Sequence, residues 1–537
     1  MNKTYKKIIL CLVCLFMFTG CTSGGSKITE EAASVDTLVI AVSRDENTFT
    51  PYTYVTGSPG LDVLRLVYDS LFSFDIDNNI IPWMIEDGYT VDADNRVYRM
   101  VLKDGLFWHD GVPLTAGDVK FTFDYALTQA RSRWKGIASQ IESLVIENEK
   151  DITITLISGN PNYLRGGLCD MPIIPKHIYE GIEDAGEYAG DTIGSSLYKL
   201  KEYKIGEFYI FEAAEGYFKG DARVSTLNMP IMTDAAAVSQ ALIAKQISAS
   251  TRNIPPETIR VFENTEGIEI LSCRGYAPVM LQFNCERKYL SEPEFRSAIA
   301  YALDIDAMIG TVALGYADKG LPGFYTDDMA GALSSRVYEY NPDTANSILD
   351  GLGYTEKNAS GIRMDGASPI TFEVLVYSSN TARIRTAELI REYLSSAGIG
   401  VTVSAMEADT VDEYVWPEFD VSEGRDYDMA MWGWSAPVQL NPASLVRLGM
   451  SDYDSGDLNI GGMRSGAYDS LCESYLGTVN AGQREEISKN LQSLLAELAP
   501  FVNLWYDRMN YAVDAAAYDG WAVQKGAGVI NRYSFLP

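Results

Sequence analysis

Residues 68–124 constrain the fold of this chain more than any other segment, because turn-forming residues and short apolar runs alternate along them. Residues 77–79 tolerate tight turns, and residues 97–102 alternate in the manner of a half-buried strand. Thr115 and Asp118 have the spacing of a capping box, with Asp in place of the usual Glu, and predict the start of a helix. The stretch therefore predicts a scaffold and carries no catalytic pattern.

The same stretch contains a spaced set of residues: Tyr68, Ser70, Leu71, Asp75, Pro82, Phe107, Asp110, Gly111, Pro113, Leu114, Thr115, Ala116, Asp118 and Val119. In this spacing they resemble the sequence motif of the extracellular solute-binding proteins of family 5, the peptide-, nickel- and oligopeptide-binding receptors of ABC importers. Two later segments, residues 295–304 and 341–354, also resemble segments of this family. At a further family position Tyr198 is kept, whereas Phe218 stands where the family has Trp.

This resemblance implies an α/β, periplasmic-binding-protein-like fold of type II, in the large three-domain cluster, with two lobes and a hinge cleft. It also implies the domain limits. Domain I is discontinuous and combines residues 36–70, 196–280 and 496–537. Domain II is expected at residues 71–195, and domain III at residues 281–495.

Periodicity adds local predictions within domain III. Residues 370–377, 382–397 and 399–406 read as strand, helix and strand, with Gly398 ending the helix, and predict a parallel βαβ unit. Residues 291–294 have the pattern of a capping box, and the helix that follows is expected to turn Arg296 outward.

The N-terminus predicts export and anchoring. Residues 1–20 contain three lysines followed by the apolar run 8–18, which is shorter than the roughly 20 residues that span a bilayer as a helix. Cys21 follows Gly20 and precedes a small, polar tether at 21–35, as in a bacterial lipoprotein. The alternative is an ordinary signal peptide with an accidental cysteine. We expect lipid on Cys21 and a protein that faces the extracytoplasmic side of the cell membrane, at the cell surface or in the periplasm.

Composition and absent motifs exclude several classes of protein. The net charge of −30 argues against nucleic acid as a partner. The chain has only two histidines, and it lacks the H-E-x-x-H, P-loop, Rossmann and nucleophile-elbow motifs. We therefore expect no catalytic residues, no cofactor and no metal site. Cys273 and Cys285 flank two predicted strands, and the sequence leaves open whether they form a disulfide.

Candidate ligand contacts gather where aromatic residues meet strand ends. The segment 431–442 is an aromatic strand end followed by a proline-containing loop, which suits the wall of a concave site. Family relatives approach ligand at this Gly-Trp region and just after the first strand; the alternative for Trp432 is a core position. The predicted ligand-binding residues are Trp434, Trp432, Tyr52, Tyr54, Tyr377, Arg383, Tyr276, Asn284 and Gln439.

The resemblance also bears on the ligand. Dipeptide-binding relatives use an aspartate after the Gly-Trp pair and an arginine before the next helix, and these positions hold Pro437 and Tyr377 here. Arg383 is a possible substitute for the arginine. No acid lies between Trp432 and Met450, so the sequence predicts that a free α-amine is not the main recognition group.

Taken together, the resemblance implies a monomeric, lipid-anchored substrate-binding protein of an ABC importer. It captures a peptide or peptide-like solute between its lobes and delivers it to a permease and ATPase complex. One alternative is a cell-surface hydrolase acting on peptides or glycans. Another is a receptor of the same fold for a metal chelate or an oligosaccharide.

Overall fold

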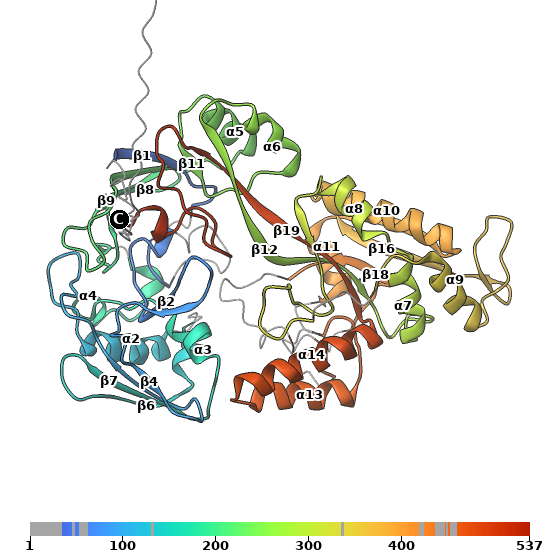
Figure 1. The fold of residues 1–537 in the computed structure, drawn as a ribbon, viewed down its shortest axis with the longest axis horizontal. Coiled ribbons are helices and arrows are strands. Elements are labelled where there is room, and N and C mark those ends of the chain that lie inside the picture. The colour runs from blue at the N-terminus through green and yellow to red at the C-terminus, as the bar shows by residue number, and fades with distance from the viewer. Residues whose placement is uncertain are drawn as a thin grey trace, which may run out of the picture.

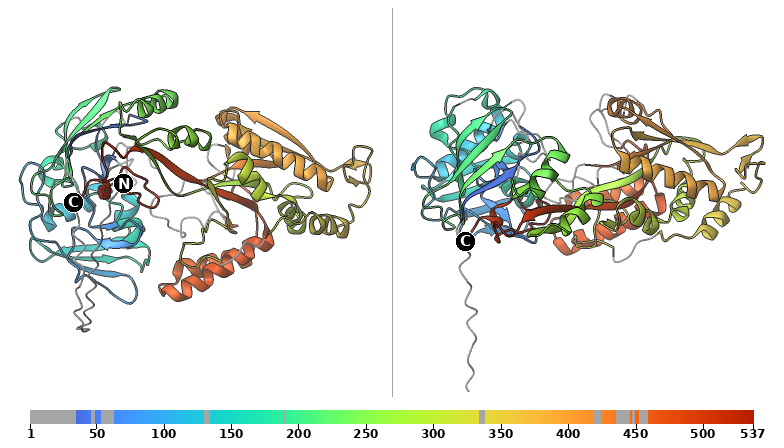
Figure 2. Two further views of the ribbon diagram at one scale, coloured as in Figure 1. Left: turned by 45° about the horizontal axis from the view of Figure 1, so that its top comes forward. Right: turned by 90° about the horizontal axis from the view of Figure 1, so that it is seen from above.

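The computed structural model describes residues 35–45, 49–52, 63–129, 134–188, 190–333, 338–417, 421, 424–434, 446, 449–451 and 459–537. Figure 1 shows two lobes, with two long strands running from one to the other. Both views in Figure 2 keep the lobes apart, with the last long strand between them. The fold is α/β, as the resemblance implied. We use the names domain I, II and III for the segments proposed above.

The first lobe contains a five-stranded sheet in the order β11-β1-β10-β9-β8. Strand β1 pairs in parallel with β10 and β11, whereas β9 pairs antiparallel with both β10 and β8. The strands are β1 (Val35–Ala41), β8 (Tyr198–Lys204), β9 (Phe208–Ala213), β10 (Val224–Pro230) and β11 (Ala249–Ser250). Helices α5 (Ala235–Ile243) and α6 (Pro256–Glu263) pack on a separate apolar cluster that includes Ala41 and Ala512.

Domain II contributes an antiparallel sheet in the order β4-β5-β7-β6 to the same lobe. The predicted capping box is confirmed: Thr115 Oγ1 accepts from the Gly117 N–H at 3.2 Å, and Asp118 Oδ2 accepts from the Thr115 N–H at 2.9 Å. The strands are β2 (Phe72–Phe74), β3 (Ile80–Pro82), β4 (Thr90–Val91), β5 (Val97–Val101), β6 (Ile141–Ile146) and β7 (Asp151–Leu156). The helices are α2 (Ala116–Thr128), α3 (Lys135–Ala138), the π-turn Leu164–Leu168, α4 (Lys176–Tyr179) and the 3₁₀ turn Ala185–Glu187.

The second lobe is built on a six-stranded sheet in the order β13-β19-β12-β18-β16-β17. The predicted βαβ unit is confirmed, since β16 and β17 pair in parallel and Gly398 ends the intervening helix α10 with φ of 85°. The strands are β12 (Ile268–Phe283), β13 (Ala317–Lys319), β16 (Thr371–Tyr377), β17 (Gly400–Met406), β18 (Met429–Trp432) and β19 (Phe501–Asp514). The helices are α7 (Pro293–Ala302), α8 (Ile305–Val312), α9 (Pro342–Gly351), α10 (Thr381–Ala397), α11 (Ala408–Val415), α13 (Gly466–Gly477) and α14 (Ala481–Leu498). A small hairpin, β14 (Met364–Asp365) with β15 (Ser368–Pro369), and a 3₁₀ turn at Arg532–Ser534 complete the elements described.

Two local predictions for α7 are wrong. The helix begins after Glu292, which makes no side-chain cap, so Ser291 forms no capping box. Arg296 is buried rather than exposed, at 2% of its accessible surface. Its guanidinium donates to the carbonyl oxygens of Leu498 and Ala499 at the end of α14, which has carbonyls left without helical partners.

Strands β12 and β19 connect the lobes, and their register shifts twice, with the larger shift near the middle. Arg274 pairs with Arg508 and Pro278 with Tyr506, so the three residues 275–277 lie opposite the single residue Asp507. A side chain at Gly275 would place its Cβ 2.3 Å from the Asp507 carbonyl oxygen, and this close approach requires glycine. Such a bulge locally disrupts the ladder and bends the strand.

The structure answers the question of a disulfide. Cys273 lies inside β12, Cys285 lies just beyond the end of that strand, and both are free thiols. Cys169 and Cys472 are also free, and both are buried. Within the described part of the chain, no helix combines the length and apolar character needed to cross a membrane.

A buried ion pair of domain I lies against domain II. Arg532 Nη2 lies 2.9 Å from Asp69 Oδ1, and the Asp69 carboxylate also accepts from Trp83 Nε1 and the Tyr217 hydroxyl, each at 3.0 Å. Burial raises the pKa of Asp69, and the Arg532 charge opposes that rise. The Asp69 carboxylate is therefore bound by side chains from both domains.

Candidate functional site

An aromatic cluster forms at the carboxyl end of β18. The Trp434 ring lies 5.5 Å from Trp416 and 6.2 Å from Trp432, between ring centroids. Trp432 is buried and packs on Tyr377 at 6.1 Å, so it stands in the core behind the site. Trp434 is half-buried and lines a pocket. Because β16 and β18 run parallel, their carboxyl ends bring Tyr377 and the tryptophans to the same edge of the sheet.

Arg383 enters this cluster from the first turn of α10. The helix is capped by Asn380, whose Oδ1 accepts the Arg383 backbone N–H at 2.9 Å. The guanidinium carbon lies 5.8 Å from the centre of the Tyr377 ring, a cation–π contact. Among the residues the structure describes, this guanidinium has no hydrogen-bond or ion-pair partner. Burial lowers the pKa of Arg383, and the nearby Tyr377 and Asp507 act in the opposite direction.

Tyr377 occupies the position where the resemblance places an arginine in dipeptide receptors. Its hydroxyl donates to Asp412 Oδ1 at 2.6 Å, and burial raises its pKa. The ring is thereby fixed beneath the Arg383 guanidinium. A positive charge is thus present close to the expected place, on the neighbouring helix.

Gly433 explains why the two tryptophans are separated by glycine. A Cβ at this position would lie 2.6 Å from Arg383 Nη2 and 2.6 Å from the Pro278 carbonyl oxygen. Any side chain would therefore collide with both the guanidinium and the backbone of β12. The absence of a side chain lets Arg383 lie against the strand end.

The pocket beside this cluster has a volume of about 450 Å³ and is lined from both lobes. Asn253 and Pro255 come from the first lobe, Arg383 and Trp434 from the second, and Asp507 from the connecting strand β19. Asp507 is exposed to the pocket, and its Oδ1 accepts from Trp505 Nε1 at 2.9 Å. The surrounding protein displaces enough water to raise the pKa of Asp507. The pocket thus combines an aromatic wall with charges of both signs.

The other predicted residues lie elsewhere or outside the described part of the chain. Tyr276 donates to Asp328 Oδ2 at 3.0 Å and lines a second pocket between the lobes. Asn284 is buried, and its amide donates to the Tyr427 carbonyl oxygen at 2.8 Å inside domain III. Tyr52 packs within the first lobe against Tyr125, at 5.6 Å between ring centroids. Cys21, Tyr54 and Gln439 lie outside the described residues.

The second interlobe pocket has a volume of about 350 Å³ and brings domain II against domain III. Arg484 Nη1, at the start of α14, donates to Asn162 Oδ1 at 3.1 Å across the lobes. Its guanidinium stacks on Tyr475 at 4.4 Å, while its buried Nε and Nη2 have no hydrogen-bond partner. Buried donors without partners cost free energy, so this contact stabilises the approach of the two lobes only weakly. Opening of the lobes would expose these donors to water and remove that cost.

Sequence reasoning missed Asp507, Asn253 and Pro255 as pocket residues. Asp507 sits in a strand without a recognisable motif, and the two others belong to a loop before α6. All three reach the pocket only because β12, β19 and the α6 segment meet there in space. No local sequence pattern could have identified them.

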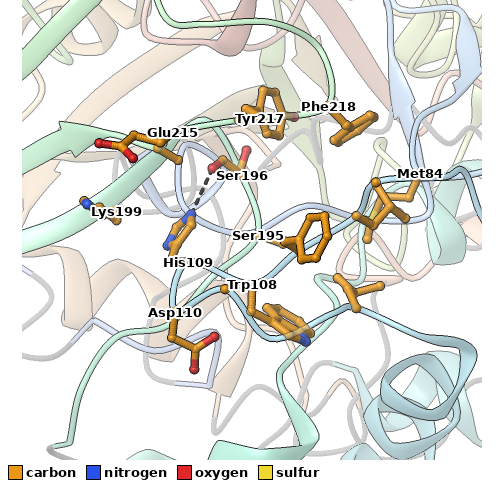
Figure 3. Close-up of a pocket in the computed structure, with 17 residues that line it drawn as sticks. Met84, Trp108, His109, Asp110, Ser195, Ser196, Lys199, Glu215, Tyr217 and Phe218 are labelled. Atoms are coloured by element: carbon orange, nitrogen blue, oxygen red, sulfur yellow. Dashed lines mark hydrogen bonds between the residues drawn. The ribbon is translucent and has the colours of Figure 1, made fainter.

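A third pocket, of about 490 Å³, lies at the junction of domains I and II (Figure 3). His109 Nε2 bonds to the Ser196 carbonyl oxygen at 2.9 Å, and the Gly194 N–H donates to His109 Nδ1 at 3.2 Å. These partners require a neutral ring protonated on Nε2. Burial lowers the pKa of His109 to about 4. Within the described ranges, no group of three or more His, Cys, Asp or Glu side chains is arranged to hold a metal ion.

Comparison with known proteins places these features in a family. Residues 79–455 match the model of the bacterial extracellular solute-binding proteins, family 5. The chain belongs to this family. The oligopeptide-binding protein AppA of Bacillus subtilis is 24% identical over 532 residues, which cover 95% of each chain.

Solved structures that match nearly the whole chain share its fold. The ABC transporter substrate-binding protein CtaP of Listeria monocytogenes superposes with a TM-score of 0.82 at 23% identity, over 94% of this chain and 99% of its own. NikZ of Campylobacter jejuni, in complex with Ni(L-His), gives a TM-score of 0.73 at 23% identity, over 94% and 99%. The type II fold is therefore confirmed, and membership of family 5 makes the chain a non-enzymatic transport receptor.

Replacing Gly433 with Ala tests how tightly Arg383 is seated. We expect the free energy of unfolding to fall by about 1–3 kcal/mol, since overpacking a site without free space costs roughly this much. Gly310→Ala is the matched control in the same domain, because a Cβ there meets nothing within 4 Å. In an Arg383→Ala background the cost of Gly433→Ala should shrink. An equal cost in both backgrounds, measured by urea unfolding, would contradict the packing described.

The buried His109 predicts a pH dependence of stability. Its pKa is about 4 in the folded protein and about 6.5 when exposed, so the unfolded chain takes up the proton first as pH falls. Stability from this group is complete above pH 6.5 and is lost as the pH falls towards 4. His109→Gln should flatten the unfolding profile between pH 5 and 6.5, whereas His177→Gln should leave the His109 contribution in place. An unchanged profile in His109→Gln would refute the assignment.

Proposed function

We propose a ligand and a binding pocket for this substrate-binding receptor of an ABC importer. We propose that it captures a peptide or peptide-like solute in the 450 Å³ pocket between the lobes and delivers it to the membrane permease. The observation that carries this proposal is the Arg383 guanidinium, which has no acidic partner among the described residues and lines the same pocket as the half-buried Trp434. A carboxylate and an apolar group of a peptide would complement these two side chains.

The proposal is tested by asking which solutes the protein retains. The purified receptor is incubated with a pool of synthetic tri- to nonapeptides, desalted and analysed by native mass spectrometry. Parallel incubations use nickel chelates and short oligosaccharides. Retained peptides support the proposal, whereas retention of a chelate or sugar alone would favour the receptor for a non-peptide solute. Arg383→Ala should lose retained peptides, and the exposed Arg385→Ala, on the same helix, should keep them.

Ligand binding should close the lobes. A solute that contacts both lobes shifts the equilibrium between open and closed forms towards the closed one. Small-angle scattering should therefore give a smaller radius of gyration with a retained peptide than without it. The same peptide should stabilise the fold by about 2.7 kcal/mol at one hundred times its dissociation constant. Identical scattering profiles with saturating peptide would argue against hinge closure.

We also propose that the receptor is a monomer anchored to the extracytoplasmic side of the cell membrane by lipid on Cys21. The basic, apolar and small residues before Cys21 support this proposal, and the family's extracytoplasmic role agrees with it. Cys21→Ala should abolish acyl labelling and release or misprocess the protein. Cys273→Ala, which changes a cysteine far along the chain, should label normally. Acyl labelling that persists in Cys21→Ala would refute the anchor.

A further inference from the structure

The pocket between the lobes contains two opposite charges that do not pair with each other. Arg383 has no ion-pair partner among the described residues, although Asp507 lines the same pocket. Asp507 in turn uses one carboxylate oxygen to accept from Trp505 Nε1, and among the described residues no cation lies within ion-pair distance of it. Each charge affects the other, because Arg383 lowers the pKa of Asp507 while Asp507 raises that of Arg383. The two charged groups are therefore close enough to interact, but they do not form an ion pair.

Arg383 differs in this respect from the arginines of the nearby strands β12 and β19, which have acidic partners. Arg274 is paired with Asp318 at 3.3 Å and with Asp328 at 2.8 Å, and Arg508 is paired with Asp318 at 2.9 Å. In a chain with 73 acidic residues, a largely covered guanidinium that lacks an acidic partner is conspicuous. Covering a charge without a partner is costly, and a bound ion of opposite sign removes that cost.

Both charges are fixed in position before any ligand arrives. Arg383 is seated on Tyr377 and against Gly433. Asp507 is fixed by Trp505 Nε1, and its backbone lies opposite the bulge 275–277 of β12. Fixed partners lower the entropy cost of binding and set the separation that a ligand must span.

We infer that the pocket selects a zwitterionic peptide, with a carboxylate on Arg383 and an ammonium group on Asp507. This inference rests on the proposed function and names the chemistry of its ligand. It departs from the prediction that a free amine is unimportant. That prediction considered acids in the loop after Trp434, whereas Asp507 comes from β19. The solute would be held where the strands pass between the lobes.

One other acid borders the pocket. Glu257, in the first turn of α6, is exposed on the side of the first lobe. Arg508 also borders the pocket, but it is bound to Asp318. Glu257 is therefore the rival position for the ammonium group, and the experiment has to separate it from Asp507.

The test compares four versions of one pool of synthetic tri- to pentapeptides: free termini, N-acetylated, C-amidated, and doubly blocked. Competition calorimetry and native mass spectrometry measure what the full-length receptor retains. Each charge-assisted contact is expected to change affinity about tenfold to a hundredfold. Wild-type protein should therefore prefer the free pool over either singly blocked pool by about this factor.

Variants assign the two ends of the peptide. In Asp507→Asn, N-acetylation should make no further difference, while C-amidation should still weaken binding. In Arg383→Gln the pattern should reverse. Glu257→Gln should keep both sensitivities. Unaltered melting curves and circular dichroism of the variants would show that each remains folded.

The outcomes separate this inference from the function on which it rests. Blocked pools that bind as well as the free pool would overturn the zwitterion while leaving the peptide receptor intact. A sensitivity to acetylation that survives Asp507→Asn but disappears in Glu257→Gln would move the ammonium site to Glu257 and overturn the role of Asp507. Retention of no peptide from any pool would overturn both proposals.

Discussion

The connection between the lobes is the constraint on which the rest of this structure depends. Strands β12 and β19 carry the chain from one lobe into the other and belong to the sheet of the second lobe. A ladder of this kind resists bending except where its pairing is interrupted. The larger of its two interruptions, at residues 275–277 opposite Asp507, therefore bends the strand where it passes between the lobes. Gly275 is required there because the two backbones touch.

The first lobe has the opposite character, because its two domains are fastened through buried polar groups. Asp69 pairs with Arg532 inside domain I and also accepts from Trp83 of domain II, so separating the two domains would take one donor from a buried carboxylate. His109 adds a second fastening through the carbonyl oxygen of Ser196. The contact of Arg484 with Asn162 between the lobes is weaker, since two of its donors are unmet. The contacts between domains I and II are thus better satisfied than this contact between the lobes.

The sequence predicted those features that depend on neighbouring residues. The capping box at Thr115, the helix stop at Gly398 and the parallel βαβ unit are local patterns, and the structure confirms all three. Arg296 was placed wrongly because its partners, the last carbonyls of α14, lie about two hundred residues away in the chain, as the separation of 202 for Leu498 shows. Asp507 was missed for the same reason. Its importance comes from the meeting of β19, α10 and the α6 segment, which no periodicity encodes.

The resemblance predicted a region and particular residues, and the structure treats the two differently. The Gly-Trp pair led correctly to the pocket wall, and Gly433 is needed there because Arg383 lies against it. Counting along the motif, however, assigned the ligand's charged ends to Pro437 and Tyr377, neither of which is charged. Arg383 and Asp507 bring a charge of each sign to the same pocket from a helix and from the hinge strand. A cleft that several segments line can present the same pair of charges from different helices or strands. A bound solute responds only to the positions of those charges in space. Family position therefore predicts the region of a site more directly than the residues that line it.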